Sequence, residues 1–327
     1  MTPHDYSADG DFRLLSAKFG SGNSWADVLE RIGPKILGPF VPFGWEYWEL
    51  PDPCCGKEKS LVIRFLYQGK EIASTIAEGQ ATSGKWACLL PNAAAAYFSS
   101  LMPGMLEPLR RLPAEHSVSQ LEEAIVASGL SNCSNNSYPQ RLQPFLGKGL
   151  GIWQYPAQFA PYLMAVREIR PASYLEIGIR FGGTFAFTAE YLRLFGRLER
   201  AAGVDLLDSP FARGYAASTP SVRLVVGDSH DERTIGKEGF DLVLLDGDHY
   251  QAGLEKDFEL YSPGCKAVAV HDICDQGFDN GAIEFWKRLK AERAGEFGFK
   301  EFVSQYPEIT AFSGGKTLFG IGLATRR

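Results

Sequence analysis

The stretch Tyr174-Leu-Glu-Ile-Gly-Ile-Arg-Phe-Gly-Gly-Thr184 carries the clearest structural signal in this chain of 327 residues. An apolar segment runs into a glycine-rich turn, which is the pattern of a strand followed by a helix. Gly178, Gly182 and Gly183 have no Cβ and would let the backbone approach a ligand closely. Such turns occur in nucleotide-binding enzymes of many kinds and also as purely structural turns. The context of the turn must therefore identify the ligand.

From about residue 150 to the C-terminus, the sequence alternates between strand and helix patterns. This alternation predicts an α/β domain with a Rossmann-like, doubly wound and mostly parallel sheet. The expected helices cover residues 157–169, 184–194, 250–261 and 282–294. The expected strands cover residues 173–177, 201–205, 223–226, 240–246, 267–271 and 318–324.

Acidic residues accompany the first three predicted strands. Asp205 ends the second strand, where a carboxylate can accept hydrogen bonds from ribose hydroxyls. Asp228 follows the third strand and is placed for a polar contact with an adenine edge. Glu176 lies within the first strand, where dinucleotide-binding folds usually have an apolar residue, and it suits a cofactor with an amino group and a positive sulfonium. The glycine spacing also departs from G-x-G-x-x-G, which disfavours NAD.

The next two predicted strands end in clusters of polar residues. The fourth strand leads into Asp246, Asp248 and His249, and the fifth ends at His271 and Asp272. In open α/β sheets, ligands bind beyond the carboxyl ends of the strands, so the two clusters should face one crevice. Crowded carboxylates repel one another without a counter-charge, and a divalent metal would supply it.

With these residues, the sequence resembles the class I S-adenosylmethionine-dependent methyltransferases over roughly residues 150–327. The glutamate-x-glycine motif, Asp205 and Asp228 match the first three strand ends of that family in order. The resemblance implies that Glu176 and Gly178, with the other glycines of the turn, lie near the methionine part of S-adenosylmethionine. It also implies that Asp205 binds the ribose, that Asp228 lies near the adenine, and that the C-terminal sheet edge is antiparallel.

The fourth and fifth strand ends look like those of metal-dependent small-molecule and sugar O-methyltransferases, including enzymes that act on macrolide sugars. They also resemble a bacterial group labelled cephalosporin-hydroxylase-like, which shares the Asp-Gly-x-His and His-Asp patterns. The resemblance implies that Asp246 and Asp272 ligate Mg²⁺ and that His249 is the general base. Relatives often carry another oxygen ligand where this chain has His271, and imidazole suits Zn, Fe or Mn better than Mg²⁺. The predicted metal site is therefore Asp246, His271 and Asp272, with His271 either ligating a softer metal or pointing elsewhere.

Other residues near these clusters have two interpretations each. Asp275, or Asp279 with Asn280, offers a further oxygen ligand, although loop capping is the simpler interpretation. The segment Trp153-Gln-Tyr-Pro156 either folds over the cofactor or anchors the entry to the domain. His230 either lines the cofactor pocket or lies in a surface loop.

Together these features predict metal-assisted transfer of a methyl group from S-adenosylmethionine to a hydroxyl of a small molecule, such as a sugar or a glycosylated natural product. A metal lowers the pKa of the hydroxyl, a histidine takes the proton, and the oxygen attacks the methyl group in line with sulfur. One alternative is a non-heme iron oxidoreductase using His249, His271 and Asp272, although such sites usually lie in β-barrels. Another is a cofactor-binding protein without catalysis, which would not need Asp246, His249 and Asp272 together.

The composition of the chain limits the kinds of partner that we expect for it. A net charge of −6, with 45% hydrophobic and 22% charged residues, is that of an ordinary soluble globular protein without the basic excess of a nucleic-acid-binding surface. The N-terminus lacks the pattern of a signal peptide, and no stretch approaches the ~20 apolar residues of a membrane span. The six cysteines show no paired spacing, so we expect reduced thiols in a cytoplasmic protein.

A run of turn-forming residues between 131 and 151 predicts a domain boundary. We therefore expect an N-terminal α+β domain over residues 1–145 and a methyltransferase domain over residues 146–327. The N-terminal domain should serve oligomerisation or substrate recognition, which is consistent with a homo-oligomer. Its expected elements are a helix from Ser24 to Ile32, a hairpin over residues 60–76, and a helix with Ser119 and Glu122 as a capping box that ends near Gly129.

Overall fold

The alternation of strands and helices after residue 150 is confirmed in the computed structural model. The structure describes residues 12–33, 40–41, 50–67, 69–77, 87–88, 94–131, 138–146, 148–206, 208–236, 238–274 and 281–327. The chain divides into two compact units. The first unit comprises residues 1–101 and 207–214, and the second comprises residues 102–206 and 215–327.

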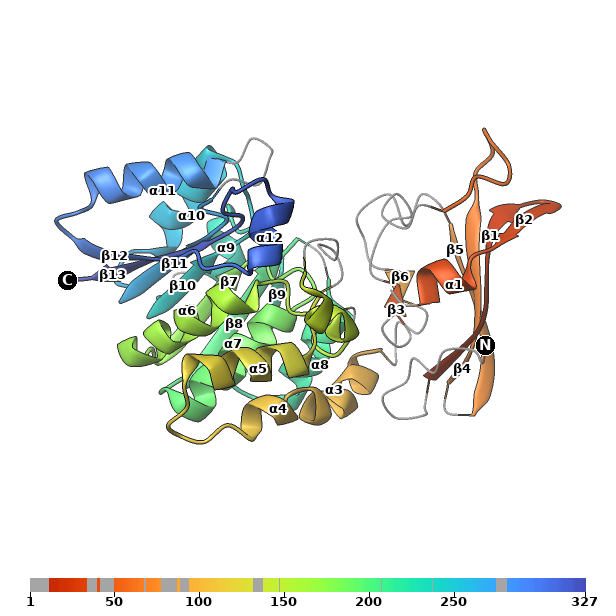
Figure 1. The fold of residues 1–327 in the computed structure, drawn as a ribbon, viewed down its shortest axis with the longest axis horizontal. Helices are drawn as coiled ribbons and strands as arrows, with labels where there is room; N and C mark the ends of the chain where they lie inside the picture. Colours follow the sequence, from red (N-terminus) through yellow and green to blue (C-terminus); the bar gives the residue numbers. More distant parts are fainter. Residues whose placement is uncertain are drawn as a thin grey trace. The chain divides into compact units, whose positions relative to one another are not determined.

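The second unit is built on a seven-stranded sheet, in the order β12-β13-β11-β10-β7-β8-β9 (Figure 1). The five strands from β11 to β9 pair in parallel, and the antiparallel edge expected at the C-terminus is present as β13 and β12. The strand bounds are β7 Ser173–Ile177, β8 Arg200–Asp205, β9 Val222–Val226, β10 Leu242–Leu245, β11 Ala267–His271, β12 Phe297–Phe302 and β13 Ile321–Arg326. This is the predicted doubly wound, Rossmann-like sheet.

Helices cover both faces of this sheet (Figure 1), which explains why its central strands are mostly apolar. Side chains of a strand alternate between faces, so Leu175 and Ile177 of β7 pack against α10 and α11, while Tyr174 and Glu176 take the opposite face. The remaining elements of this part of the chain are α4 Glu107–Arg110, α5 Val118–Ser128, the 3-10 helix η4 Gln140–Phe145, α6 Pro156–Ile169, α7 Gly183–Phe195, α9 Glu232–Ile235, α10 Gln251–Tyr261, α11 Gly281–Glu292 and α12 Pro307–Phe312.

The strand order places a switch point beside β7. The chain runs from β7 through β8 to β9 on one side of β7, and through β10 to β11 on the other. In sheets of this kind the crevice beyond the carboxyl ends of the strands at the switch point is the usual ligand site. The predicted site residues follow the strands that meet there.

The division between the units differs from the predicted boundary at residues 145 and 146, because residues 102–145 lie in the second unit. Helix α5 packs against α6, and Leu130 forms bridges with Leu146 and Ile152. The capping box of α5 is Ser117 with Gln120, so the prediction of Ser119 and Glu122 was wrong by two residues, although the helix ends at Ser128, next to Gly129, as expected.

The first unit contains a four-stranded sheet in the order β2-β1-β4-β5. The predicted hairpin is confirmed by the antiparallel pairing of β4 and β5. The expected helix from Ser24 was wrong: Ser24 begins a strand that pairs with β1, and only one helical turn follows it. The bounds are β1 Phe12–Ser21, β2 Ser24–Asp27, α1 Leu29–Ile32, β3 Phe40–Val41, β4 Ser60–Tyr67, β5 Lys70–Ala77 and β6 Ala87–Cys88, while α3 Ala94–Met105 and α8 Pro210–Ser218 cross the division between units.

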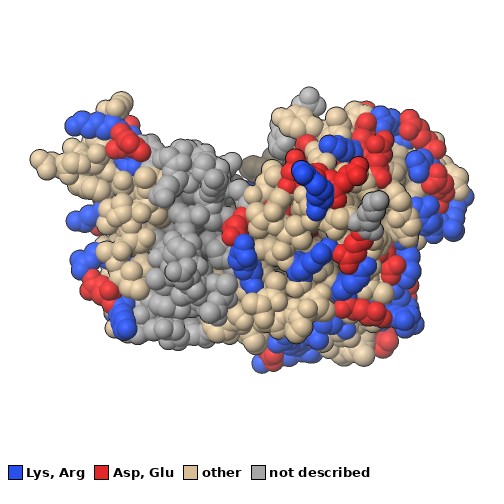
Figure 2. All heavy atoms as spheres, turned by 180° about the vertical axis from the view of Figure 1, so that it is seen from behind, with Lys and Arg blue, Asp and Glu red and all other residues tan. Residues whose placement is uncertain are grey.

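Two surface properties bear on the expected partners. Among the described residues, no helix is both long and apolar enough to span a membrane. On the face of the second unit drawn in Figure 2, basic and acidic side chains are interspersed, so this face carries no extended field of one sign.

Candidate functional site

The glycine turn between β7 and α7 packs tightly against its own chain. Gly178 has φ 83°, and a Cβ there would lie 2.2 Å from the carbonyl oxygen of Asp246. A Cβ on Gly183 would lie 1.9 Å from the carbonyl oxygen of Leu150, and Gly182 caps α7 with φ 89°. Glycine is thus required at these positions for chain packing and backbone conformation. Their predicted approach to a cofactor stays a prediction.

Asp205, at the end of β8, is held against this turn. The backbone N–H of Arg180 donates a hydrogen bond to Asp205 Oδ2 at 2.6 Å. Arg180 itself has φ 49°, and its guanidinium lies 3.7 Å from the ring centre of Trp153. The two predicted cofactor-binding segments, the turn and the second strand end, therefore meet in the structure.

Trp153 and Gln154 connect the turn to the end of β10. The backbone N–H of Trp153 donates to Thr184 Oγ1 at 3.3 Å, and Gln154 Nε2 donates to Asp246 Oδ2 at 3.1 Å. This segment lies beside the glycine turn, as the interpretation that it covers a cofactor requires.

Glu176 is buried, with 1% of its surface exposed, and accepts a hydrogen bond from the hydroxyl of Tyr174. Burial raises the pKa of the Glu176 carboxyl to about 8, against the lowering effect of the Tyr174 hydrogen bond and with a further increase from Asp246. The carboxyl is therefore mainly protonated at neutral pH. A cation bound near it would favour ionisation.

Asp228 accepts hydrogen bonds from residues of the turn that follows it. Its Oδ1 accepts a hydrogen bond from the backbone N–H of His230 at 2.9 Å, and its carbonyl accepts one from Thr234 Oγ1 at 2.6 Å. The side chain is 62% exposed, so it remains accessible to a ligand. The predicted contact with adenine is not tested by these interactions.

His230 faces α10, where sequence reasoning missed a buried acid. Its Nε2 lies 3.2 Å from the carbonyl oxygen of Gly253 and 3.6 Å from Asp257 Oδ1. Asp257 is fully buried, and burial raises its pKa to about 6. The signal was present in the sequence, because Asp257 falls on the same helical face as Leu254, Phe258 and Tyr261.

The strongest constellation joins the carboxyl ends of β10 and β11. His249 Nδ1 lies 3.1 Å from Asp272 Oδ2. His271 Nδ1 lies 2.9 Å from Asp246 Oδ1 and 3.0 Å from Asp272 Oδ1. The prediction that these two strand ends face each other is borne out by these distances. Asp248 does not join them: its Oδ1 accepts a hydrogen bond from the backbone N–H of Tyr250 at 2.8 Å, at the start of α10.

Two imidazoles with different exposure share the carboxylates. The His249 side chain is 42% exposed, and its hydrogen bond with Asp272 raises its pKa above the usual value, against the opposing effect of burial. His271 is 4% exposed and stacks on Phe319, with ring centres 6.1 Å apart. Burial would lower the pKa of His271, but Asp246 and Asp272 outweigh it and raise the pKa to about 9. The arrangement can supply an accessible base beside a buried cation.

The predicted Mg²⁺ ligands do not fit a magnesium site. Within the described ranges, no group of three or more His, Cys, Asp or Glu residues is arranged to hold a metal ion. Mg²⁺ requires oxygen ligands in octahedral geometry, whereas the atom that lies against both carboxylates is a nitrogen of His271. Asp275, Asp279 and Asn280 lie outside the described residues.

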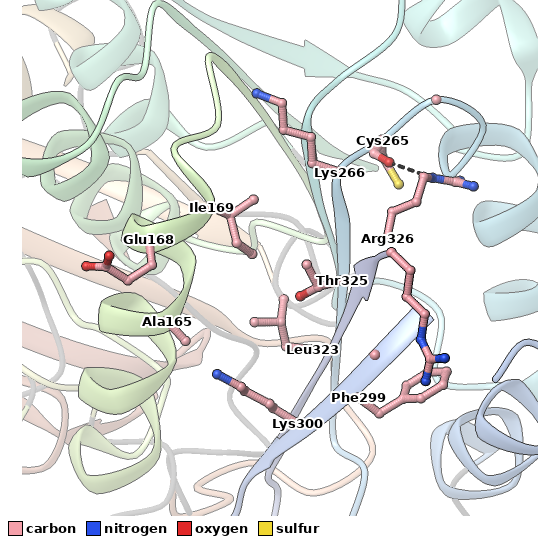
Figure 3. A pocket seen from close by; sticks show the side chains of 13 residues that line it. Ala165, Glu168, Ile169, Cys265, Lys266, Phe299, Lys300, Leu323, Thr325 and Arg326 are labelled. Carbon is pink, nitrogen blue, oxygen red and sulfur yellow. Dashed lines mark hydrogen bonds between the residues drawn. The ribbon is translucent and has the colours of Figure 1, made fainter. Parts of the chain in front are cut away.

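A separate cavity lies at the opposite end of the sheet (Figure 3). It has a volume of about 710 Å³ and is bordered by α6 and by the amino end of β11, where Ala267 pairs with Thr325. Because Asp272 follows the carboxyl end of β11, this cavity is not part of the constellation. Its lining includes Glu168, Ile169, Cys265, Lys266, Phe299, Lys300, Leu323 and Arg326.

Comparison with known proteins supports the class predicted from the sequence. Residues 175–273 match the model of a family described as a methyltransferase domain. This segment runs from β7 to just beyond β11 and contains the glycine turn and all four residues of the constellation. This part of the second unit is thus similar to a methyltransferase domain, as the sequence resemblance predicted. A comparison with curated proteins finds no match.

Several solved structures are similar to this chain at low sequence identity and low TM-score. An O-methyltransferase from Bacillus cereus in complex with SAH is 15% identical, covers 71% of this chain and 100% of its own, and has a TM-score of 0.40. The O-methyltransferase TomG from Streptomyces achromogenes, involved in tomaymycin synthesis, is 18% identical, with coverage of 71% and 96% and a TM-score of 0.38. A putative caffeoyl-CoA O-methyltransferase from Staphylococcus aureus is 12% identical, with coverage of 71% and 100% and a TM-score of 0.41. These similarities are too low to transfer a substrate to this chain.

Proposed function

We propose that the second unit transfers the methyl group of S-adenosylmethionine to a hydroxyl of a small molecule, with His249 as the general base. The observation that carries the proposal is the pairing of His249 Nδ1 with Asp272 Oδ2 at 3.1 Å. This pair stands at the carboxyl ends of β10 and β11, within the segment that matches a methyltransferase domain. The sequence resemblance implied a sugar or a glycosylated natural product as the acceptor, by analogy with metal-dependent enzymes, and the acceptor assay below includes phenols as well.

The cofactor would be held by the residues at the first three strand ends. Glu176 and the glycine turn would contact its methionine part, Asp205 its ribose and Asp228 its adenine. The geometry is consistent with this assignment, since the turn and Asp205 are joined through the Arg180 N–H. When bound, S-adenosylmethionine supplies an electrophilic methyl group on a positive sulfur.

His249 would move the proton. Its Nδ1–H donates to Asp272, which leaves Nε2 with a lone pair to accept the proton of the acceptor hydroxyl. As the oxygen forms its bond to the methyl carbon, the carbon–sulfur bond breaks and its electron pair stays on sulfur. The positive charge of the sulfonium thereby ends on His249, where the Asp272 carboxylate stabilises it. A base of this kind contributes roughly 10²–10⁴-fold to a rate.

The predicted metal has no part in this mechanism, because the residues present do not fit a magnesium site. The iron-dependent oxidoreductase that the sequence left open would also need His249, His271 and Asp272 as metal ligands. The Nδ1 atoms of the two histidines instead lie 2.9–3.1 Å from carboxylate oxygens of Asp246 and Asp272. No observation favours oxidation over methyl transfer.

The test is the His249→Ala variant in an assay of S-adenosylhomocysteine release, run with a panel of phenols, sugars and glycosides. We expect transfer to fall by roughly 10²–10⁴-fold while the dissociation constant for S-adenosylhomocysteine stays nearly unchanged. His249→Gln, which keeps a polar side chain but cannot accept the proton, should behave in the same way. Loss of cofactor binding in both variants would show that His249 lies in the cofactor site and is not the base.

A further inference from the structure

The carboxylates of Asp246 and Asp272 are enclosed by nitrogen atoms of the protein. Asp246 Oδ1 lies 2.9 Å from His271 Nδ1, and Asp246 Oδ2 accepts a hydrogen bond from Gln154 at 3.1 Å. Asp272 Oδ1 lies 3.0 Å from the same His271 nitrogen, and Asp272 Oδ2 lies 3.1 Å from His249. Each of the four carboxylate oxygens therefore has a nitrogen neighbour within 3.1 Å.

We propose that this site works without a divalent cation, because the His271 ring occupies the position between Asp246 and Asp272 that such a cation would take. The inference rests on the proposed methyl transfer and concerns how the same site achieves it. A divalent ion could reach both carboxylates only if His271 moved away. The ring is buried and stacked on Phe319, which opposes that movement.

His271 then acts as a positioning residue. Its Nδ1 lies within 3.0 Å of one oxygen of each carboxylate, so the ring fills the space between the two side chains. This contact holds Asp272 in place, and the other oxygen of Asp272 lies 3.1 Å from His249.

A site without a metal also limits the acceptor. A bound metal lowers the pKa of a coordinated water from about 15.7 to about 7 and would acidify a coordinated hydroxyl in the same way, whereas a histidine base leaves the pKa of the hydroxyl unchanged. A phenolic hydroxyl, with a pKa of about 10, is then favoured over a sugar hydroxyl by several powers of ten in ionisation. The inferred acceptor is thus a phenol or another acidified hydroxyl, and it needs no neighbouring hydroxyl for chelation.

The test measures metal content, not activity alone. The full chain is treated with EDTA, dialysed separately against Mg²⁺, Mn²⁺, Fe²⁺ or Zn²⁺, and analysed by elemental mass spectrometry and calorimetry. The wild-type chain should retain no stoichiometric metal. His271→Glu should gain Mg²⁺ or Mn²⁺ affinity by roughly tenfold or more, because a third carboxylate replaces the ring. His271→Gln is the matched control and should gain none.

Two results would overturn the inference: a stoichiometric metal in the wild-type chain that Asp246→Ala removes, or a folded His271→Glu chain that binds no metal. If His271→Glu does not fold, His271→Asp replaces it. S-adenosylhomocysteine binding is measured on the same samples. Absence of that binding would count against the proposed methyl transfer, while the metal measurements would still decide the inference about His271.

Discussion

At the scale of single residues, the chemistry depends on how one carboxylate is divided between two imidazoles. Asp272 presents one oxygen to His271 and the other to His249. It has φ 61°, in the left-handed region that few residues other than glycine adopt. This backbone conformation follows directly after β11 and sets the direction of the side chain. Aspartate is, with asparagine, the non-glycine residue that tolerates this conformation best, which suits it to this position.

The Asp272→Asn variant should shift the acid limb of the pH–rate profile. Asp272 raises the pKa of His249, and the base is active only when it is neutral. Removing the carboxylate lowers that pKa, so the acid limb should move to lower pH. The maximal rate should fall by roughly 10²–10⁴-fold, because the imidazole is no longer oriented or stabilised after protonation.

Asp248→Asn is the matched control for this profile. Asp248 lies two residues from Asp246 but binds the backbone N–H of Tyr250 and no imidazole. Its profile should follow that of the wild-type chain. An unchanged acid limb in Asp272→Asn would mean that another group than His249 is titrating.

At the scale of secondary structure, α10 carries a buried acid against the turn after β9. Burial raises the pKa of Asp257 to about 6, above its ordinary value of 3.8. Between these two values the folded chain binds more protons than the unfolded chain, so stability should fall as the pH rises from about 4 to about 6. The full shift corresponds to at most about 3 kcal/mol.

Asp257→Asn should therefore flatten this part of the stability profile and raise stability at neutral pH. Urea unfolding at intervals between pH 4 and pH 7 measures both effects. Glu259→Gln, which changes an exposed acid on the same helix, is the control and should keep the wild-type slope. Equal slopes in wild-type and Asp257→Asn chains would contradict the burial argument.

The elements that the sequence predicted well are those with a strong burial pattern. Strands β7 and β11 are buried at every position, and their mostly apolar sequences made them easy to predict. Strand β12 was missed because it lies at the sheet edge, where only Phe297 is buried and the adjacent Lys300 and Glu301 are both exposed. Ser24 was misassigned because a serine before apolar residues fits both a helix cap and a strand that pairs with distant residues.

The candidate site could be predicted in composition but not in detail. Polar residues after buried strands indicated which side chains meet, and the distances of His249 and His271 to Asp272 bear this out. The sequence could not show that the His271 ring takes the position assigned to the metal, since this depends on side-chain geometry. It also could not show that Asp248 is used to begin α10.

At the scale of the whole molecule, the region between residues 102 and 145 falls in the second compact unit. Leu121 and Ile125 of α5 are fully buried, and Tyr306 donates a hydrogen bond to Glu122 at 2.6 Å. The buried Glu190 is paired with Arg110 at 3.0 Å. These contacts join the segment to the rest of the second unit, whereas the turn-forming residues at its C-terminal end had suggested a domain boundary there.

Two truncated chains test this assignment. The chain of residues 146–327 should unfold at a lower temperature than the chain of residues 102–327, since it lacks α5 and exposes the face of α6. Each buried aliphatic side chain that is lost accounts for about 1.5–3 kcal/mol. Thermal unfolding followed by circular dichroism measures the difference. Equal midpoints would place the boundary at residue 145 as the sequence predicted.

The central claim is that the second unit binds S-adenosylmethionine at the carboxyl ends of its strands, and calorimetric titration of the full chain tests it most directly. We predict binding of S-adenosylmethionine and S-adenosylhomocysteine that is unchanged by EDTA and is lost or strongly weakened in Asp205→Ala. If neither ligand binds with or without added metal, the assignment of the site as a methyltransferase centre is wrong.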